Sequence, residues 1–244
     1  MANAASPWHG RVRLGLGWAL FHGVVGDNHV HAHHALQAVL GEQGAAVRVQ
    51  TDRLHAGRGL LIDADVPHQL LASHAPQTLV YIDRESRYGR VLSRAMSEPV
   101  RPLPDALVDA FLPMTQLAPA EPPDRWLAER LAEGPALLPV NDALIEALLP
   151  RIDVQLAAPL SAAALAASLQ LSPGRFLHRF RAHTGLPLRP YLRWRRLVLA
   201  LQQMLAGMPL THAAHAAGFA DAAHFTRTCR RHFGLAPSAL KSLA

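Results

Sequence analysis

The sequence predicts an α+β protein in which a β-rich N-terminal domain, a helical connecting segment and an all-α C-terminal domain follow one another. Three observations predict this order: short apolar or alternating segments fill residues 12–90, prolines recur through residues 91–150, and helical periodicity runs from residue 160 onward. Short strands at a spacing of roughly 10 residues are typical of a barrel or a sandwich. We therefore expect domains at residues 1–90 and 153–244, joined by a connecting segment at residues 91–152.

The expected N-terminal strands are short apolar runs separated by glycine and proline. They comprise Leu36–Leu40, Ala46–Gln50, Gly59–Ile62 and Thr78–Ile82. Glycine and proline end such runs because glycine enters turn conformations freely and proline cannot donate a main-chain hydrogen bond.

The connecting segment is divided into short pieces by ten prolines between residues 91 and 150. Three short helices fit between them, at Asp105–Leu112, Asp124–Ala132 and Asn141–Leu149. Asp105, Asp124 and Asn141 suit the N-cap or the first turn of these helices. Two interpretations stay open: the helices form a dimer surface or clasp between the domains, or they only cover the β-domain.

The C-terminal domain repeats one pattern, in which a short helix, a tight turn and a second helix follow one another. The expected helices are Ser161–Leu169, Ser172–His183, Leu188–Ala206, Thr211–Ala217 and Asp221–His232. The first two and the last two each form a helix-turn-helix unit. The helix between them has about 19 residues, or roughly 28 Å at 1.5 Å per residue, which is comparable with one turn of duplex DNA at about 34 Å.

Charge is distributed unevenly along the chain. The net charge is +6, but residues 151–244 hold twelve Lys and Arg against two acids, a net +10, which leaves −4 for residues 1–150. This asymmetry predicts a module that binds a polyanion, joined to a domain with another task. The second helix of each unit carries cationic and histidine side chains, namely Arg175, His178, Arg179, Arg181, His224, Arg227, Arg230 and Arg231. Phe176, Phe180, Phe225 and Cys229 provide the apolar side of the same helices.

A set of residues at fixed spacing extends over residues 155–240. It consists of Leu165, Ala166, Ser172, Pro173, Phe176 to Arg181, Thr184, Gly185, Tyr191, Arg196, Leu197, Ala200, Ala213, Ala214, Gly218 to Asp221, Phe225, Arg227 and Gly234 to Ser238. On these residues the chain resembles the AraC/XylS family of bacterial transcription regulators. It departs from the usual pattern at His178, where the family has arginine, and at Cys229, where it has phenylalanine. The small Gly174 and the apolar Leu177 stand at groove-facing positions.

The resemblance implies a regulator that binds promoter DNA sequence-specifically, and no enzyme. The residues expected to contact DNA are Arg175, Leu177, His178, Arg179 and Arg181 in the first unit, and Ala222, Ala223, His224, Thr226, Arg227 and Arg230 in the second. RNA polymerase and a second copy of the chain are further candidate partners. Whether transcription rises or falls does not follow from the sequence.

The N-terminal half contains histidines at a recognisable spacing. His31 and His33 are followed after three residues by Gln37, and after six more by Gly44. This resembles the first motif of cupins, with Gln37 in the place of the usual glutamate, and residues 59–68 resemble a degraded second motif ending at His68. The resemblance covers residues 20–85 and implies a cupin-like β-barrel, which AraC-like regulators often carry as a sensor.

In metal-binding cupins, two histidines, a carboxylate and a third histidine converge, and His31, His33, Gln37 and His68 match those places. Two histidines one residue apart on a strand point to the same side, which suits shared ligation. Imidazole nitrogens and an amide oxygen could hold Zn, Ni, Fe or Mn. The other interpretation is a remnant of the fold that lines a ligand pocket without metal.

The leading hypothesis is therefore a regulator whose cupin-like domain senses a small molecule or a metal. The main alternative is a cupin metalloenzyme with a helical appendage, against which Gln37 and the C-terminal motifs argue. A third interpretation makes the β-domain only a dimerisation scaffold. The chain has one cysteine, no uncharged apolar run of 18 residues and no basic start followed by an apolar stretch, so we expect a cytoplasmic protein without membrane association.

Overall fold

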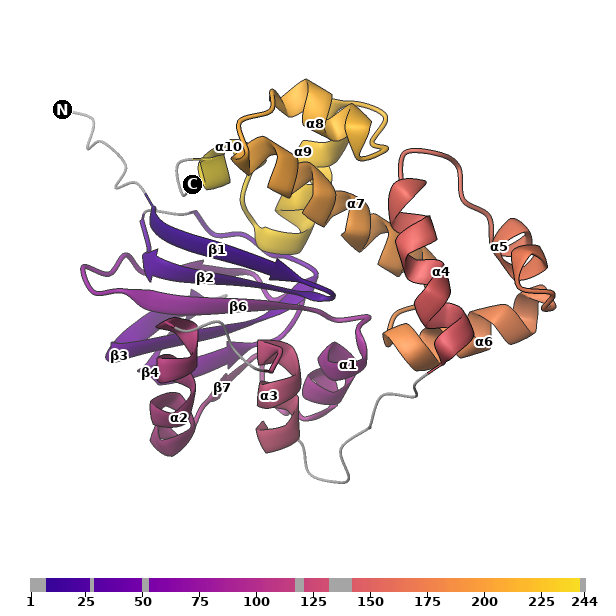
Figure 1. Ribbon diagram of the computed structural model, residues 1–244. Coiled ribbons are helices and arrows are strands. Elements are labelled where there is room, and N and C mark those ends of the chain that lie inside the picture. The colour runs from indigo at the N-terminus through magenta and orange to yellow at the C-terminus, as the bar shows by residue number, and fades with distance from the viewer. Residues whose placement is uncertain (1–7, 27–28, 50–52, 117–120, 132–141, 242–244) are drawn as a thin grey trace. The chain divides into compact units, whose positions relative to one another are not determined.

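The computed structural model describes residues 8–26, 29–49, 53–116, 121–131 and 142–241 (Figure 1). The chain divides into two compact units. The first combines residues 1–84, 88–134 and 229–244, and the second combines residues 85–87 and 135–228. Within the described residues, no helix is both long and apolar enough to cross a membrane.

The first unit is built on an antiparallel sheet. Its strands are β1 (His9–Gly15), β2 (Trp18–Val24), β3 (Ala35–Val49), β4 (Arg53–Ile62), β5 (His68–Leu70), β6 (Gln77–Asp83) and β7 (Val100–Pro102). Their order is β1-β2-β6-β3-β4-β7, and β5 pairs with β3. The predicted α+β class is confirmed. The predicted barrel is not, because β1 and β7 stand at opposite ends of this order and the sheet of the described residues does not close.

Strand β3 contains two of the predicted strands in one continuous element of 15 residues. Its register with β4 shifts between Leu40 and Ala45, and Gly44 there has φ +94°, a conformation that favours glycine. The first half of β3 pairs with β6 and the second half with β5. The glycines that suggested a break in the sequence therefore mark an irregularity inside a strand.

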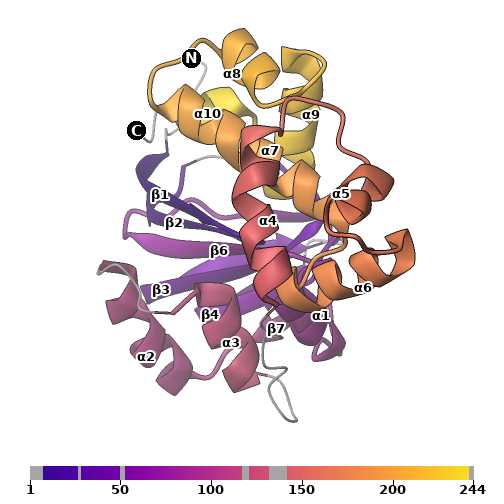
Figure 2. The ribbon, with the colours of Figure 1, turned by 45° about the vertical axis from the view of Figure 1, so that its right-hand side comes forward.

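Two helices cover one face of the sheet, as Figures 1 and 2 show: α2 (Asp105–Gln116) and α3 (Pro123–Leu131). Phe111 of α2 and Trp126 of α3 are buried with their ring centroids 5.2 Å apart, against apolar side chains of the sheet. These helices were expected at Asp105 and Asp124, and they pack as covers of the β-domain. Two further short helices, α1 (Arg87–Arg94) and α10 (Pro237–Lys241), were not predicted.

The second unit is helical. Its helices are α4 (Ala143–Val154), α5 (Ala162–Ser168), α6 (Pro173–Thr184), α7 (Leu188–Leu205), α8 (Leu210–Ala216) and the first part of α9 (Ala222–Phe233). Ile145, Leu148 and Ile152 of α4 are buried in one core with Phe176 and Phe180. The boundary expected between residues 152 and 153 thus falls inside α4, a helix that packs with the first helix-turn-helix unit.

Helix caps explain why most of these helices begin where the sequence indicated. Ser161 and Ser172 cap α5 and α6 with their side chains, and Pro173 occupies the first turn of α6. The helix expected from Thr211 begins one residue earlier, at Leu210 after Pro209. The cap of α4 is Asp142. The cap expected at position 141 lies outside the described residues.

Asp124 is a buried carboxyl group in the first turn of α3. Its residue is 3 % exposed, and its Oδ1 atom has no hydrogen-bond partner among the described residues. Burial raises the pKa of Asp124 to about 7 from 3.8. The unfolded chain therefore loses this proton at lower pH than the folded chain, and the free energy of unfolding falls as pH rises from about 3.8 to 7.

We predict that Asp124→Asn stabilises the protein at pH 8 and leaves it little changed at pH 4, because asparagine keeps an acceptor and cannot ionise. The gain at pH 8 is expected at about 1–4 kcal/mol, given about 1.4 kcal/mol per pKa unit. Denaturant unfolding at both pH values measures it. A variant that is less stable than the native protein at pH 8 would contradict this assignment.

Candidate functional site

The first helix-turn-helix unit consists of α5, a turn and α6. Ser161 Oγ accepts a hydrogen bond from the Ala164 main chain at 3.1 Å, which starts α5. The turn passes through Gln170 at φ +55°. Leu171 N then donates to Ala166 O at 3.0 Å, so the chain reverses tightly before α6. This turn fixes the direction of the second helix relative to the first.

The second helix-turn-helix unit consists of α8, a turn at Gly218 and α9. Gly218 has φ +83°, and a Cβ atom there would lie 2.6 Å from Leu156 O, so only glycine fits. The rings of Phe219 and Phe225 lie 5.2 Å apart and pack the turn against the helix. The Asp221 carboxylate accepts a hydrogen bond from the His224 main-chain N–H and caps α9, at the residue where the predicted helix begins.

Helix α7 lies between the two helix-turn-helix units in the chain, and the N-terminal half of α7 shares a buried core with α4. Two of its arginines are held inside the fold. The Arg195 guanidinium donates to both Asp153 oxygens at 2.9 and 2.7 Å, and Arg196 Nε donates to Leu156 O at 2.8 Å. These cations stabilise the packing of α7 on the chain before α5. The net charge of the C-terminal third therefore overstates the charge that is free to meet a polyanion.

Helix α6 has a solvent face and a buried face. Phe176 and Phe180 are fully buried. The exposed side chains of the predicted set are Arg175, Leu177, His178 and Arg181. Arg179 differs, because its Nε and Nη2 atoms donate to the Asp142 carboxylate at 2.6 and 2.7 Å. The sequence did not reveal this pair, since the two residues stand 37 positions apart.

Helix α9 shows the same division. Phe225 and Cys229 are fully buried. The exposed members of the predicted set are Ala223, His224, Arg227 and Arg230, whereas Ala222 and Thr226 are half-buried. Burial raises the pKa of the Cys229 thiol, which fits a core residue rather than a reactive one. Both helix-turn-helix units therefore present a second helix with basic side chains opposite a packed apolar face.

We predict that Asp142→Asn lowers the thermal midpoint by about 2–5 °C, because it removes the ion pair with Arg179 and retains a good N-cap residue. The Arg179 hydrogen bonds hold the pKa of Asp142 below its ordinary value. The stabilisation is therefore present above about pH 3.8 and lost as pH falls below it. Calorimetry at pH 7 and pH 3 measures both effects.

The matched control is Asp109→Asn, which removes an exposed pair with Arg58. Exposed ion pairs contribute little, so this variant should keep the native midpoint within about 1 °C. Equal midpoints for the two variants would show that the Arg179–Asp142 pair has no structural role.

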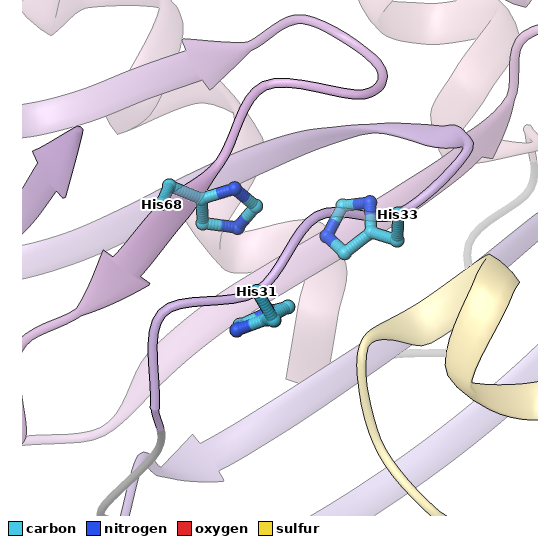
Figure 3. A group of neighbouring side chains, drawn as sticks. All are labelled: His31, His33 and His68. Atoms are coloured by element: carbon cyan, nitrogen blue, oxygen red, sulfur yellow. The ribbon is translucent and has the colours of Figure 1, made fainter. Parts of the chain in front are cut away.

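Three histidines meet in the first unit (Figure 3). His31 and His68 form an isolated antiparallel bridge, with N–H···O=C distances of 2.9 and 2.8 Å between their main chains. Their ring centroids lie 4.7 Å apart, and the His33 ring lies 5.0 Å from that of His68. One ligand atom of each histidine lies within 4.8 Å of those of the others. The convergence expected from the sequence is present.

Gln37 of β3 lies beside two of these rings. Its Oε1 atom is 3.2 Å from His33 Nε2 and 2.9 Å from His68 Nε2, and the residue is fully buried. Tyr81, which is opposite Gln37 in the β3–β6 register, lies 5.3 Å from His33 between ring centroids. The sequence carried no signal for Tyr81, because its position depends on the pairing of strands distant in the chain.

The histidines are neutral at pH 7. Burial lowers the pKa of His33 to about 4 and that of His68 to about 3. Burial also lowers the pKa of His31, which is more exposed. A neutral imidazole retains one nitrogen lone pair and can therefore bind a metal ion or accept a hydrogen bond from a ligand.

Comparison with known proteins gives matches to the C-terminal part and to the fold. Residues 165–242 match a family described as a helix-turn-helix domain. The transcriptional activator RhaS of Escherichia fergusonii is 36% identical over 103 residues, which are 41% of this chain and 37% of that protein. The chain thus spans little more than a third of the length of this relative.

Two solved structures of ToxT from Vibrio cholerae strain SCE256 are similar over nearly the whole chain. An apo form that carries a single substitution has a TM-score of 0.51 at 8% identity and covers 93% of this chain and 97% of its own. The wild-type protein bound to an unsaturated fatty acid has a TM-score of 0.46 at 10% identity, covering 98% and 95%. The first likeness shows the fold: an N-terminal sheet followed by a helical region.

Proposed function

We propose that the protein is a transcription regulator of the AraC/XylS family, and that it binds promoter DNA sequence-specifically under the control of an effector of its N-terminal domain. The helix-turn-helix match at residues 165–242 and the likeness to RhaS support this proposal. The observation that carries the proposal is the arrangement of α6 and α9. Each is the second helix of a helix-turn-helix unit, which is the element that enters the major groove in proteins of this kind.

The chemistry of the exposed faces supports groove binding. Arg175, His178 and Arg181 on α6, and His224 and Arg227 on α9, are exposed and offer hydrogen-bond donors. Arginine pairs in a bidentate manner with guanine edges and with phosphates. The small Ala223 allows the main chain of α9 to approach a base pair closely. Arg179 contributes less in this arrangement because Asp142 already binds its guanidinium.

The spacer supports binding of both units by one duplex. Helix α7 has 18 residues, which corresponds to about 27 Å. This is close to one turn of duplex DNA, about 34 Å. Two second helices joined in this way address successive major grooves on one face of the duplex. A symmetric pair of chains would present four such helices, and RNA polymerase is the further partner that we expect at a promoter.

The N-terminal unit is the proposed input, because its buried histidine cluster offers polar atoms for a small molecule or a metal ion. The alternative of a cupin metalloenzyme has less support, because His33 and His68 are 2 % and 1 % exposed and the residue beside them is a neutral glutamine.

We predict that Arg227→Ala weakens binding to a selected operator by about 5–100-fold, since one arginine contact is worth about 1–3 kcal/mol. Operators are first enriched from a random duplex library with the full chain and then titrated at increasing salt. The native affinity should fall steeply with salt because phosphate contacts release counterions.

Arg53→Ala is the matched control, since Arg53 is an equally exposed arginine at the start of β4. It should keep the native affinity and salt dependence. Failure to enrich any sequence, or equal losses for Arg227→Ala and Arg53→Ala, would overturn the proposed function.

A further inference from the structure

We propose that His31, His33 and His68 bind one divalent first-row transition-metal ion through their three Nε2 atoms, with Gln37 Oε1 completing the ligand set. The inference deepens the proposed function by naming the class of effector, and it rests on that function only for its regulatory consequence. The metal site itself depends only on the geometry of the cluster.

The first step is the protonation of the rings. The Nδ1 atoms of His31, His33 and His68 lie 2.8, 2.9 and 2.8 Å from the main-chain oxygens of His29, Ala35 and Val66. A carbonyl oxygen only accepts hydrogen bonds, so each Nδ1 carries the hydrogen. In a neutral imidazole the lone pair then resides on Nε2. This is the arrangement in which metal-binding histidines are usually held, with the second nitrogen donating to a carbonyl or carboxylate.

The second step is the position of Gln37. Its Oε1 atom faces the Nε2 atoms of His33 and His68 at 3.2 and 2.9 Å. Because the lone pair of each ring is on Nε2, each contact brings two hydrogen-bond acceptors together, a ring Nε2 atom and Gln37 Oε1. Without a hydrogen or a cation between them, these atoms repel each other. The Nε2 atom of Gln37 is buried and has no hydrogen-bond partner among the described residues. If a cation lies among these lone pairs, the facing atoms become adjacent ligands of one ion and no longer repel.

The distances fit that interpretation. A tetrahedral ion with bonds of about 2.0–2.1 Å to nitrogen and oxygen has ligand atoms about 3.3 Å apart. The two separations from Gln37 Oε1 are 3.2 and 2.9 Å, close to such an edge. Turning the amide over would also satisfy the rings, but it would leave Oε1 as the buried atom without a partner. A cation, unlike the turned amide, would use the lone pairs of all three rings together with Oε1, and the metal titration decides between the two arrangements.

The fold holds the ligands from separate segments. His31 and His68 are fixed by their reciprocal main-chain hydrogen bonds, and His68 also pairs with Val49 at the end of β3. Gln37 stands near the start of the same strand. Twelve residues of straight strand would separate Gln37 and Val49 by about 40 Å. The irregularity within β3 therefore brings both ends of one strand to the same histidine.

The ligand chemistry selects the ion. Among the described residues the cluster contains three histidines and no acid, so its ligand set is neutral. Imidazole suits Zn²⁺, Ni²⁺, Cu²⁺ and Fe²⁺, whereas Mg²⁺, Ca²⁺ and Mn²⁺ prefer carboxylate and carbonyl oxygens. We therefore expect Zn²⁺ to bind and Mg²⁺ not to compete.

Contacts within the first compact unit indicate how metal binding would affect residues beyond the ligands. His34 N donates to Arg231 O at 2.7 Å, and a Cβ atom on Gly234 would collide with the His31 ring. The Tyr81 ring lies 5.3 Å from that of His33 and 5.5 Å from that of Phe233. Fixing the histidine rings on an ion therefore changes the surface on which the last residues of α9 pack.

The test uses the full chain, freed of metal by a chelator and titrated with Zn²⁺ by calorimetry in the presence of Mg²⁺. One ion should bind per chain, and Co²⁺ should give the visible absorption of a low-coordinate site. His68→Ala should weaken binding at least tenfold, whereas His74→Ala, which removes an exposed histidine outside the cluster, should not. Gln37→Glu should tighten binding, a gain that misfolding cannot produce.

Absence of saturable one-to-one binding, or unchanged affinity in both His68→Ala and Gln37→Glu, would overturn the metal site. The operator affinity of the same preparations tests the regulatory consequence separately. A Zn²⁺-dependent shift of at least threefold in the native chain that is lost in His68→Ala supports it, and equal affinities with and without Zn²⁺ overturn it. Loss of all operator binding would instead refute the proposed function and leave the metal titration to stand.

Discussion

Helix α7 must bury a long apolar face against the helices that precede and follow it in the chain. The geometry of the compact helical unit depends on that burial. Trp194, Leu197 and Ala200 are fully buried near its middle. Tyr191 belongs to the core formed with α4 to α6, while α8 packs on the same helix. A helix of this length is rigid when one face is packed along its whole extent. The two helix-turn-helix units are therefore held by one element rather than joined by a flexible linker.

The polar contacts of this unit follow from the same constraint. Arg195 and Arg196 lie beside the buried face and bind Asp153 and main-chain oxygens, and Arg179 binds Asp142. The Arg195 and Arg196 contacts hold α7 to α4 and to the chain that follows α4, and the Arg179 contact holds α6 to the N-cap of α4. Many of the arginines that remain exposed lie on α6 and α9, among them Arg175, Arg181 and Arg227.

The sequence predicted local structure well where side chains act on their own helix. Ser161, Ser172 and Asp221 mark helix starts because their hydrogen bonds reach only three residues along the chain. The burial of Phe176 and Phe180 follows from helical periodicity in the same way. The single long β3, the open sheet and the Arg179–Asp142 pair could not be predicted, because each depends on which distant segments meet.

The histidine cluster combines a feature that the sequence predicts with features that it does not predict. That His31 and His33 share a side follows from the alternation of side chains along an extended segment. That Gln37 reaches His68, 31 residues away, depends on how β3 bends. The carbonyl oxygens that fix each Nδ1 hydrogen carry no sequence signal at all, since every residue has such an oxygen. Yet these oxygens decide that the ring lone pairs face one another.

The central claim is that two helices, held at a fixed spacing by α7, bind successive major grooves of one duplex. Hydroxyl-radical footprinting of the full chain on a selected operator tests it most directly. The account predicts protected patches in pairs on one face of the DNA, about 10 base pairs apart, with Arg227→Ala weakening one patch of each pair more than the other. A single patch for each bound chain, or protection without any helical phasing, would contradict the account.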